Sequence, residues 1–514
     1  MSQLTLHKLK KLSWYFLLLC AGIIILFWKL DDTVGLHRDE AIFGLFAEMI
    51  LNGALPVFGV FNDYTAPLHT YLLAICIKFL GNSIWSLRFL GPIFTLLTIA
   101  AIYDTVRAFS PVRATWISCL LITFPPIIML SRLCGEVFVL NPFLFFGTIW
   151  IFVRLCQNQT KYKHTTGLII IGFLTSLGIW NHAIFLPSAA SLIVCYTIFL
   201  WPGIRQYFIN GVLYSLGFLV GLSPRFVSAL FFENNLFPKR PPIPRATLKS
   251  ALLNFLYTLS GDSLYARFSG KSAIPFVWET TGIILTTLAT FYFFKRNKYE
   301  KKIFWGIYTF FVCNFIGVWL ITPFGSIGSR LWLIPAWIFP ISLVIWMPNL
   351  REWKWRVTSG ILLVTHVILL LVNHYIPNNN THGVISPSVY VGGKYDNTWD
   401  YYDHRQITNK LAQADSNLIF ISTINVFTFY YLMPPEQRHK IKLLWQAIQY
   451  STNPEKQKLY DSITYKGPIP HSALFVFYEN DKDYLETFYN LSLFKETILD
   501  EKAGIPGFKV FRFK

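Results

Sequence analysis

Long apolar runs recur along most of this chain, separated by short breaks that carry turn-forming and charged residues. Runs such as Trp14 to Leu30, Phe89 to Val106 and Ile303 to Leu320 are long enough to cross a hydrocarbon layer about 30 Å thick as a helix. Because apolar runs bounded by such breaks mark membrane-spanning helices, the pattern predicts about eleven spans. In chain order these are Trp14 to Leu30, Phe89 to Val106, Trp116 to Leu130, Phe138 to Val153, Gly167 to Trp180, Ile184 to Leu200, Phe208 to Leu222, Ile274 to Phe294, Ile303 to Leu320, Leu331 to Met347 and Val357 to Val372.

The pattern changes from about His374, where charged residues, Asn and Pro become frequent and the apolar runs shorten to strand length. Short strands that alternate with helical patterns predict an α/β layer. We therefore expect an α-helical transmembrane domain at 1–373 and a soluble α/β domain at 374–514. The expected strands are Leu418 to Ser422, Ala473 to Tyr478 and Phe508 to Phe513, and the expected helices lie around Gln406 to Ala414, Pro454 to Tyr460 and Lys482 to Tyr489.

The soluble part shows no glycine-rich phosphate loop, no nucleophile elbow and no metal-ligand spacing. It is therefore interpreted as an accessory or acceptor-binding domain. The seven cysteines lie in or beside apolar segments without paired spacing, which supports neither a disulfide framework nor a thiolate zinc site.

Composition and charge agree with a membrane protein. The chain has 54% hydrophobic and only 14% charged residues, compared with about 25% charged in soluble domains. If the N-terminus lies in the cytoplasm, alternate loops are basic, as the positive-inside rule requires. This orientation places the loop between the first two spans, and the C-terminal part, on the non-cytoplasmic side.

That loop, between Leu30 and Arg88, is called the first loop below. Asp39 and Glu40 open a segment whose apolar residues recur with helical spacing until Asn52-Gly53. A second segment, Pro67 to Leu80, has Pro at its start and Gly81 after its end. The first loop is therefore predicted to form two interfacial helices.

The motifs of the first loop carry a resemblance to a known family. They run Arg38-Asp39-Glu40-Ala41, then Leu51-Asn52-Gly53-Ala54-Leu55-Pro56, then Tyr64-Thr65-Ala66-Pro67-Leu68-His69-Thr70-Tyr71, then Phe79-Leu80-Gly81 and Arg88-Phe89. The pattern resembles the protein O-mannosyltransferase and aminoarabinose transferase superfamily of GT-C fold. The likeness covers roughly the first 350 residues in layout, although its specific content lies mostly in this loop.

The resemblance implies an inverting glycosyltransferase that uses a polyprenyl-phosphate sugar, with Asp39 at the position of the catalytic base. Several members of the family carry an acidic-basic pair before the proline, where this chain has Thr65-Ala66. Asp63 is the candidate for the missing carboxylate. This departure from the family pattern leaves the identity of the sugar and of the acceptor open. It affects the expected reaction class less.

Sugar transfer from a lipid phosphate needs a carboxylate to accept the acceptor's proton and positive charge to stabilise the departing phosphate. Asp39 and Glu40 are the catalytic candidates, and the alternative is that both only cap a helix. Further candidates for substrate binding are expected on the same side of the membrane, and for them membrane anchoring or local ion pairing is the alternative. These are Arg88, Arg132, Glu136, His182, Arg330 and Asp63.

The expected partners are a polyprenyl-phosphate sugar donor, a lipid, glycan or protein acceptor, and membrane lipids, whereas no nucleic acid is expected. No cofactor is certain, and a divalent metal stays open. The expected location is a bacterial inner membrane. A secondary transporter would be expected to show internal repeats and ionisable residues at mid-membrane. A lipid-linked glycan polymerase or ligase, or a non-catalytic membrane scaffold, is a further alternative.

Overall fold

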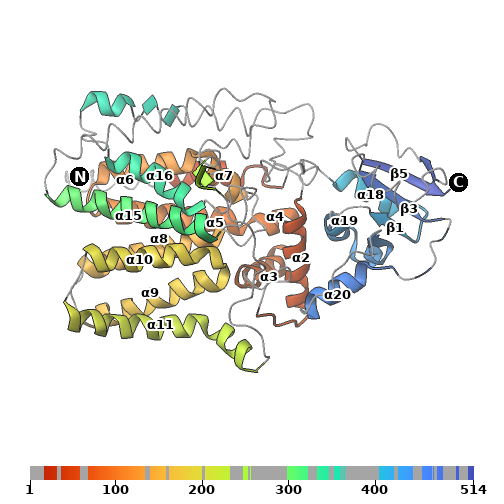
Figure 1. The fold of residues 1–514 in the computed structure, drawn as a ribbon. Helices are drawn as coiled ribbons and strands as arrows, with labels where there is room; N and C mark the ends of the chain where they lie inside the picture. Colours follow the sequence, from red (N-terminus) through yellow and green to blue (C-terminus); the bar gives the residue numbers. More distant parts are fainter. Residues whose placement is uncertain are drawn as a thin grey trace, which may run out of the picture.

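The computed structural model places a helical bundle at one end, an α/β unit at the other, and the helices of the first loop between them (Figure 1). The expected span Ile274 to Phe294 and the expected helix around Lys482 to Tyr489 lie outside the residues that the structure describes. The described residues are 17–31, 36–57, 67–132, 139–157, 161–199, 203–231, short pieces between 247 and 255, 298–321, 333–346, most of 352–364, 404–421, 426–443, 454–465, most of 467–478, 494–496 and 508–513.

The bundle consists of helices that pack both against sequence neighbours and against helices further along the chain. Helix α5 lies against α6 and α8, α9 lies against α8 and α11, and α10 lies against α15. The elements are the helix Leu17–Phe27, α5 (Leu90–Arg107), α6 (Pro111–Thr123), α7 (Pro125–Arg132), α8 (Leu140–Gln157), α9 (Lys161–Asn181), α10 (Leu186–Phe199), α11 (Ile204–Phe231), α15 (Lys298–Ile321) and α16 (Leu333–Trp346).

Two helices among the described residues, Ile84–Arg107 and Ile204–Leu230, are long and apolar enough to cross a membrane. The other apolar helices of the bundle are shorter. The total of about eleven spans therefore stays a prediction.

The expected span Trp116 to Leu130 is not one continuous helix. It is divided at Phe124, whose extended backbone (ψ 111°) separates α6 from α7. Pro125 and Pro126 follow directly, and a proline disfavours the helical region for the residue before it, here Phe124. The dipeptide therefore ends α6 although the apolar pattern continues across it.

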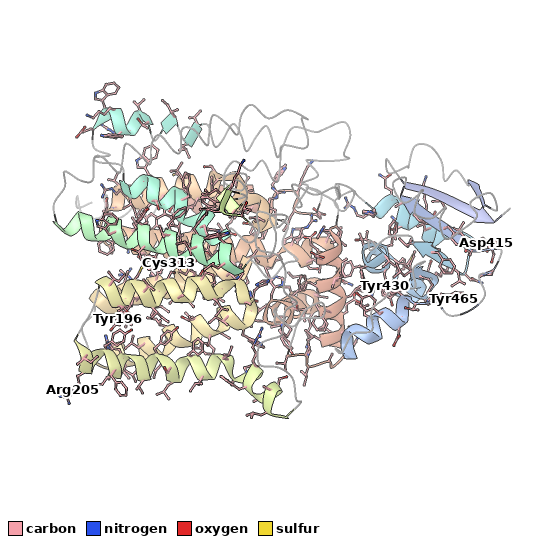
Figure 2. All side chains as sticks on the ribbon, in the orientation of Figure 1. Tyr196, Arg205, Cys313, Asp415, Tyr430 and Tyr465 are labelled. Atoms are coloured by element: carbon pink, nitrogen blue, oxygen red, sulfur yellow. The ribbon has the colours of Figure 1, made fainter. Side chains whose placement is uncertain are left out.

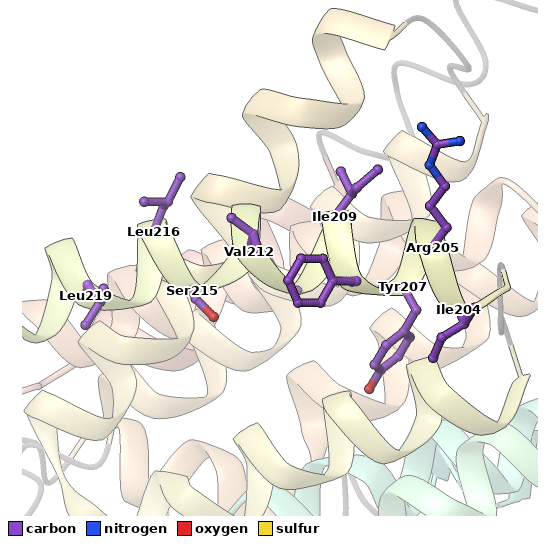
Figure 3. Close-up of a pocket in the computed structure, with 10 residues that line it drawn as sticks. Ile204, Arg205, Tyr207, Ile209, Val212, Ser215, Leu216 and Leu219 are labelled. Atoms are coloured by element: carbon purple, nitrogen blue, oxygen red, sulfur yellow. The ribbon is translucent and has the colours of Figure 1, made fainter.

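Helix α11 has one apolar side with no protein cover among the described residues. Figure 3 shows Ile209 and Leu216 on the side of this helix opposite Tyr207. Phe208 is 71% exposed and is surrounded by further exposed aliphatic side chains. Tyr207 turns inward and stacks on Tyr196 of α10, with ring centroids 5.9 Å apart (Figure 2). A surface of this kind suits contact with lipid chains.

The first loop contains helices α2 (Arg38–Leu51), α3 (Leu68–Leu80) and the short α4 (Ile84–Arg88). Asn52 is the C-cap of α2, and α3 lies between its N-cap Pro67 and its C-cap Gly81, whose φ is +82°. These ends agree with the predicted helices. Ser83 caps α4 by accepting a hydrogen bond from the backbone of Ser86.

The C-terminal unit contains a five-stranded sheet with strand order β2-β1-β3-β5-β4. Strand β1 pairs in parallel with β2 and β3, and β5 is antiparallel to β3 and β4. Strands β1, β3 and β5 lie where the sequence predicts them, whereas β2, β4 and α19 were not predicted. The elements are α18 (Arg405–Gln413), β1 (Ile419–Ile421), α19 (Val426–Leu432), the 3-10 helix η5 (Pro435–Lys440), β2 (Ile441–Leu443), α20 (Pro454–Ile463), β3 (Leu474–Tyr478), β4 (Phe494–Glu496) and β5 (Phe508–Phe513).

The helices of the first loop share a hydrophobic core with the C-terminal unit. One cluster of buried side chains joins Phe46 of α2 and Leu87 of α4 to Phe429 of α19 and Val476 of β3. A second cluster fills the bundle. The first loop is therefore packed as part of the C-terminal unit as well as of the bundle.

Helices α9 and α11 cross at glycines that allow their backbones to touch. A Cβ atom at Gly217 would lie 1.8 Å from the carbonyl oxygen of Ile169, and one at Gly172 would lie 2.0 Å from that of Tyr214. Such small-residue contacts are the usual basis of tight helix pairs in membranes.

We expect Gly217→Ala to destabilise the protein by about 1–3 kcal/mol, because the added methyl group forces the two helices apart. The measurement is the thermal unfolding midpoint of purified protein in lipid nanodiscs. Gly211→Ala is the matched control, since it lies in the same helix with open space around its Cβ position. Equal midpoints for the two variants would contradict the close packing of α9 against α11.

Candidate functional site

Helix α2 begins with a reciprocal capping arrangement. His37 is the N-cap residue, and its Nδ1 atom accepts a hydrogen bond from the backbone N–H of Asp39 at 3.2 Å. The Glu40 carboxylate accepts in turn from the backbone N–H of His37 at 3.1 Å. This is the geometry of a capping box, with histidine at a position usually taken by Ser, Thr, Asp or Asn. The unusual cap is why the sequence pattern did not reveal His37.

Glu40 and Arg88 form an ion pair with no exposed side-chain surface. Arg88 at the end of α4 donates from Nε to Oε1 of Glu40 at 2.9 Å and from Nη2 to Oε2 at 2.7 Å. Its Nη1 donates to the carbonyl oxygen of Leu30 at 3.1 Å. The two-pronged contact satisfies both carboxylate oxygens and is among the strongest arrangements of its kind. It joins α2, α4 and the end of the first helix.

Arg132 at the end of α7 reaches the same end of the first helix. Its guanidinium donates to the carbonyl oxygens of Ile25 at 3.0 Å, of Trp28 at 2.5 Å and of Lys29 at 3.1 Å. The last carbonyls of a helix lack partners inside the helix and carry a partial negative charge. Arg88 and Arg132 therefore stabilise this helix end, and both side chains are buried there.

Asp39 differs from the adjacent Glu40 in its exposure. Its side chain is 26% exposed, whereas that of Glu40 is fully buried. Phe43, one turn further along α2, lies edge-on to the ring of His69 at 6.2 Å between centroids. Because residues four apart share a helix face, Asp39 lies on the side of α2 that borders α3. Of the two acidic candidates, only Asp39 is accessible to a reactant in this structure.

The end of α9 is fixed against the first loop. Trp180 donates from Nε1 to the carbonyl oxygen of Val57 at 3.2 Å, and Asn181 donates to Oδ1 of Asn141 at 2.9 Å. His182 is nearly buried, and its Nδ1 accepts from the backbone N–H of Ile184 at 2.9 Å. A neutral His182 ring therefore carries its proton on Nε2.

The remaining predicted site residues, Asp63, Glu136 and Arg330, lie outside the described residues. Over the part of the chain that is described, no three His, Cys, Asp or Glu side chains are arranged to hold a metal ion. The possible divalent metal therefore stays an open question.

A further polar cluster beside α2 was not expected from the sequence. It consists of Glu48 of α2, Asn82 before α4, Tyr431 of α19 and Arg438 of η5. Burial, and next the charge of Glu48, raise the pKa of Tyr431 well above its usual range, so this phenol stays a hydrogen-bond donor at neutral pH. No short motif contains these residues, because they lie far apart in the sequence.

Comparison with known proteins gives a family match and a shared fold. Residues 64–228 match the family described as dolichyl-phosphate-mannose-protein mannosyltransferase. The crystal structure of ArnT from Cupriavidus metallidurans bound to undecaprenyl phosphate superposes with a TM-score of 0.63 at 12% identity, covering 97% of this chain and 98% of that chain. An oligosaccharyltransferase from Archaeoglobus fulgidus gives a TM-score of 0.46 at 12% identity, over 92% of this chain and 70% of that chain.

No curated protein matches the chain significantly. The likeness to ArnT extends over nearly the full length of both chains, so the whole architecture is shared and not only the matched segment. The matched segment and the fold shared with ArnT both agree with the expected glycosyltransferase of GT-C fold.

Proposed function

We propose that the protein transfers a sugar from a polyprenyl-phosphate donor to an acceptor on the non-cytoplasmic side of the membrane, with Asp39 as the general base. The observation that carries this proposal is the difference in exposure between Asp39 and Glu40 at the start of α2. Asp39 is partly exposed at the start of a helix that the buried Glu40–Arg88 pair holds in place. A carboxylate that is accessible but rigidly supported suits proton abstraction.

In the proposed reaction, Asp39 accepts the proton of an acceptor hydroxyl or amine while the acceptor oxygen or nitrogen attacks the anomeric carbon. The bond between that carbon and the phosphate oxygen breaks, and the lipid phosphate leaves with the electron pair. Attack from the face opposite the leaving group inverts the anomeric centre. Positive charge near the phosphate lowers the energy of this step, and Arg330 remains a candidate for it. Arg88 and Arg132, which the sequence also suggested, are buried against Glu40 and backbone carbonyl oxygens instead.

The donor class is supported by the names of the similar proteins. The matched family is described by a dolichyl-phosphate donor, and the ArnT structure is described as bound to undecaprenyl phosphate. Both are polyprenyl phosphates, so we propose a donor of this class and leave its sugar unassigned. The acceptor is a lipid, a glycan or a protein.

The proposed location is a bacterial inner membrane with the N-terminus in the cytoplasm. The first loop and the C-terminal unit then lie on the same, non-cytoplasmic side, which agrees with their shared core. We retain the division into 1–373 and 374–514 as a proposal, because the residues on both sides of it lie outside the described part.

The first prediction of this proposal concerns Asp39→Asn. We expect purified wild-type protein in nanodiscs to transfer labelled sugar from a panel of polyprenyl-phosphate donors, and the variant to lose transfer by a factor of about 10²–10⁴. The amide keeps the shape of the side chain and loses the basic oxygen. Asp415→Asn is the matched control, since Asp415 is exposed in the C-terminal unit (Figure 2).

Undiminished transfer by Asp39→Asn would show that Asp39 is only part of the helix cap. If the wild type transferred no sugar from any donor in the panel, the transporter and scaffold readings would replace this one. A polymerase or ligase would instead transfer only oligosaccharides linked to a lipid.

The second prediction separates the role of Glu40 from that of Asp39. Glu40→Gln leaves the Arg88 cation buried without its counter-charge, so we expect a loss of about 3–5 kcal/mol in unfolding free energy. The folded fraction should still transfer sugar, with kcat lowered by far less than in Asp39→Asn, because Glu40 supports the position of α2 and is not itself accessible to the acceptor. Unfolding in denaturant and transfer assays on the folded fraction measure the two effects.

Glu352→Gln is the control for this change. Glu352 forms an exposed ion pair with Lys354, and exposed pairs contribute only about 0–1 kcal/mol. A stable Glu40→Gln protein without transfer activity would assign Glu40 to the chemistry instead.

A further inference from the structure

Three residues spaced four apart along α2, Glu40, Gly44 and Glu48, form one stripe of the helix. Glu40 is bound by Arg88 of α4. The other two contact the C-terminal unit, Gly44 through Tyr431 and Glu48 through Arg438. One face of α2, the helix that carries Asp39, is therefore in contact with other elements at three positions along its length.

Gly44 lets the C-terminal unit approach the α2 backbone. A Cβ atom at this position would lie 2.5 Å from Cε2 and 2.9 Å from Cζ of Tyr431. No other residue type fits there without moving the ring. The Tyr431 ring therefore lies directly against the backbone of α2, one turn beyond Glu40.

Glu48 anchors the far end of α2. Arg438 donates from Nη1 to Oε2 at 2.5 Å and from Nη2 to Oε1 at 3.1 Å. Asn82 also donates to Glu48, and the Tyr431 hydroxyl donates to the Oδ1 atom of Asn82. The cluster thus ties α2, the start of α4 and the C-terminal unit together.

Arg438 is itself rigidly placed. It donates to the carbonyl oxygens of Met433 at 3.3 Å and of Tyr431 at 3.2 Å, and its guanidinium lies 5.7 Å from the ring centre of Tyr430. Its side chain is 11% exposed and that of Glu48 is 22% exposed. A planar guanidinium held in this way fixes the direction as well as the length of its hydrogen bonds to Glu48.

We propose that Arg438 and Tyr431 are positioning residues for sugar transfer, through which the C-terminal unit sets the rotation and axial position of α2 and thereby the place of the Asp39 carboxylate. The inference rests on the proposed function of Asp39. It gives the C-terminal unit a direct part in the reaction, although none of its residues needs to touch the substrate. A shift of the base by about 1 Å is enough to lower the rate roughly 10²-fold.

The test combines kinetics with hydrogen exchange on full-length protein in nanodiscs. We expect Arg438→Gln to lower kcat about 10- to 100-fold while KM for the lipid-linked donor stays within about twofold. Peptides covering 38–51 should exchange faster, and peptides covering α11 should not change. Lys440→Gln is the matched control, because it makes the same charge change in the same η5 helix, where Lys440 donates to the neighbouring Gln437.

Two further variants keep the test decisive. The double variant Glu48→Gln/Arg438→Gln should transfer sugar no more slowly than Arg438→Gln alone, since the two changes remove the same ion pair. Tyr431→Phe keeps the ring against Gly44 and removes the hydroxyl that binds Asn82. We expect it to lower kcat by a smaller factor, so it tests the proposal even if Arg438→Gln folds poorly.

Wild-type kcat in Arg438→Gln and Tyr431→Phe, in protein whose Asp39→Asn variant is inactive, would overturn the positioning role and leave the proposed function intact. A rise in KM without a fall in kcat would overturn it too, since that result indicates donor binding. Failure of the proposed function differs from both, because the wild type would then transfer no sugar.

Discussion

The buried contact between Glu40 and Arg88 is the interaction on which the site depends. Removing two charges from water is costly, and the attraction between them offsets that cost only if the remaining hydrogen-bonding atoms are also satisfied. Here the backbone N–H of His37 and the carbonyl oxygen of Leu30 complete the set. The pair can form in one geometry only, so it defines how α2 meets α4 and the end of the first helix.

That geometry divides the roles of the two adjacent acids. Successive residues in a helix point about 100° apart. If Glu40 faces inward to Arg88, Asp39 must face away from it, toward the side where α3 packs. The sequence pair Asp-Glu therefore gives one structural acid and one accessible acid. A pair with both side chains exposed would lack the support that a precisely placed base requires.

Local features of the fold could be predicted because local interactions determine them. Pro67 and Gly81 delimit α3, and short apolar runs revealed β1, β3 and β5. Strand β1 is as short as β2 and β4, but all its residues are apolar, whereas β2 and β4 contain charged residues and do not stand out as apolar runs. The break at Phe124 was missed because the apolar run hides the effect of the two prolines that follow.

The contacts of the site could not be predicted in the same way. Glu40 and Arg88 are 48 positions apart, and Glu48 and Arg438 are 390 apart. Helical or strand periodicity reports which face of an element is apolar, and it carries no information on which distant charge will lie opposite. The sequence could therefore name Asp39, Glu40 and Arg88 as important without predicting that two of them bind each other.

The change in composition near His374 and the boundary of the hydrophobic core are set by different physical causes. Composition changes where the chain leaves the lipid, because the solvent of its surface changes from hydrocarbon to water. The core boundary follows packing, and packing places α2, α3 and α4 in one cluster with the strands of the C-terminal unit. The membrane part would expose the apolar face of α2 if it folded alone. The first loop therefore links the two parts mechanically, which is the arrangement needed if the C-terminal unit is to control a base that it does not contain.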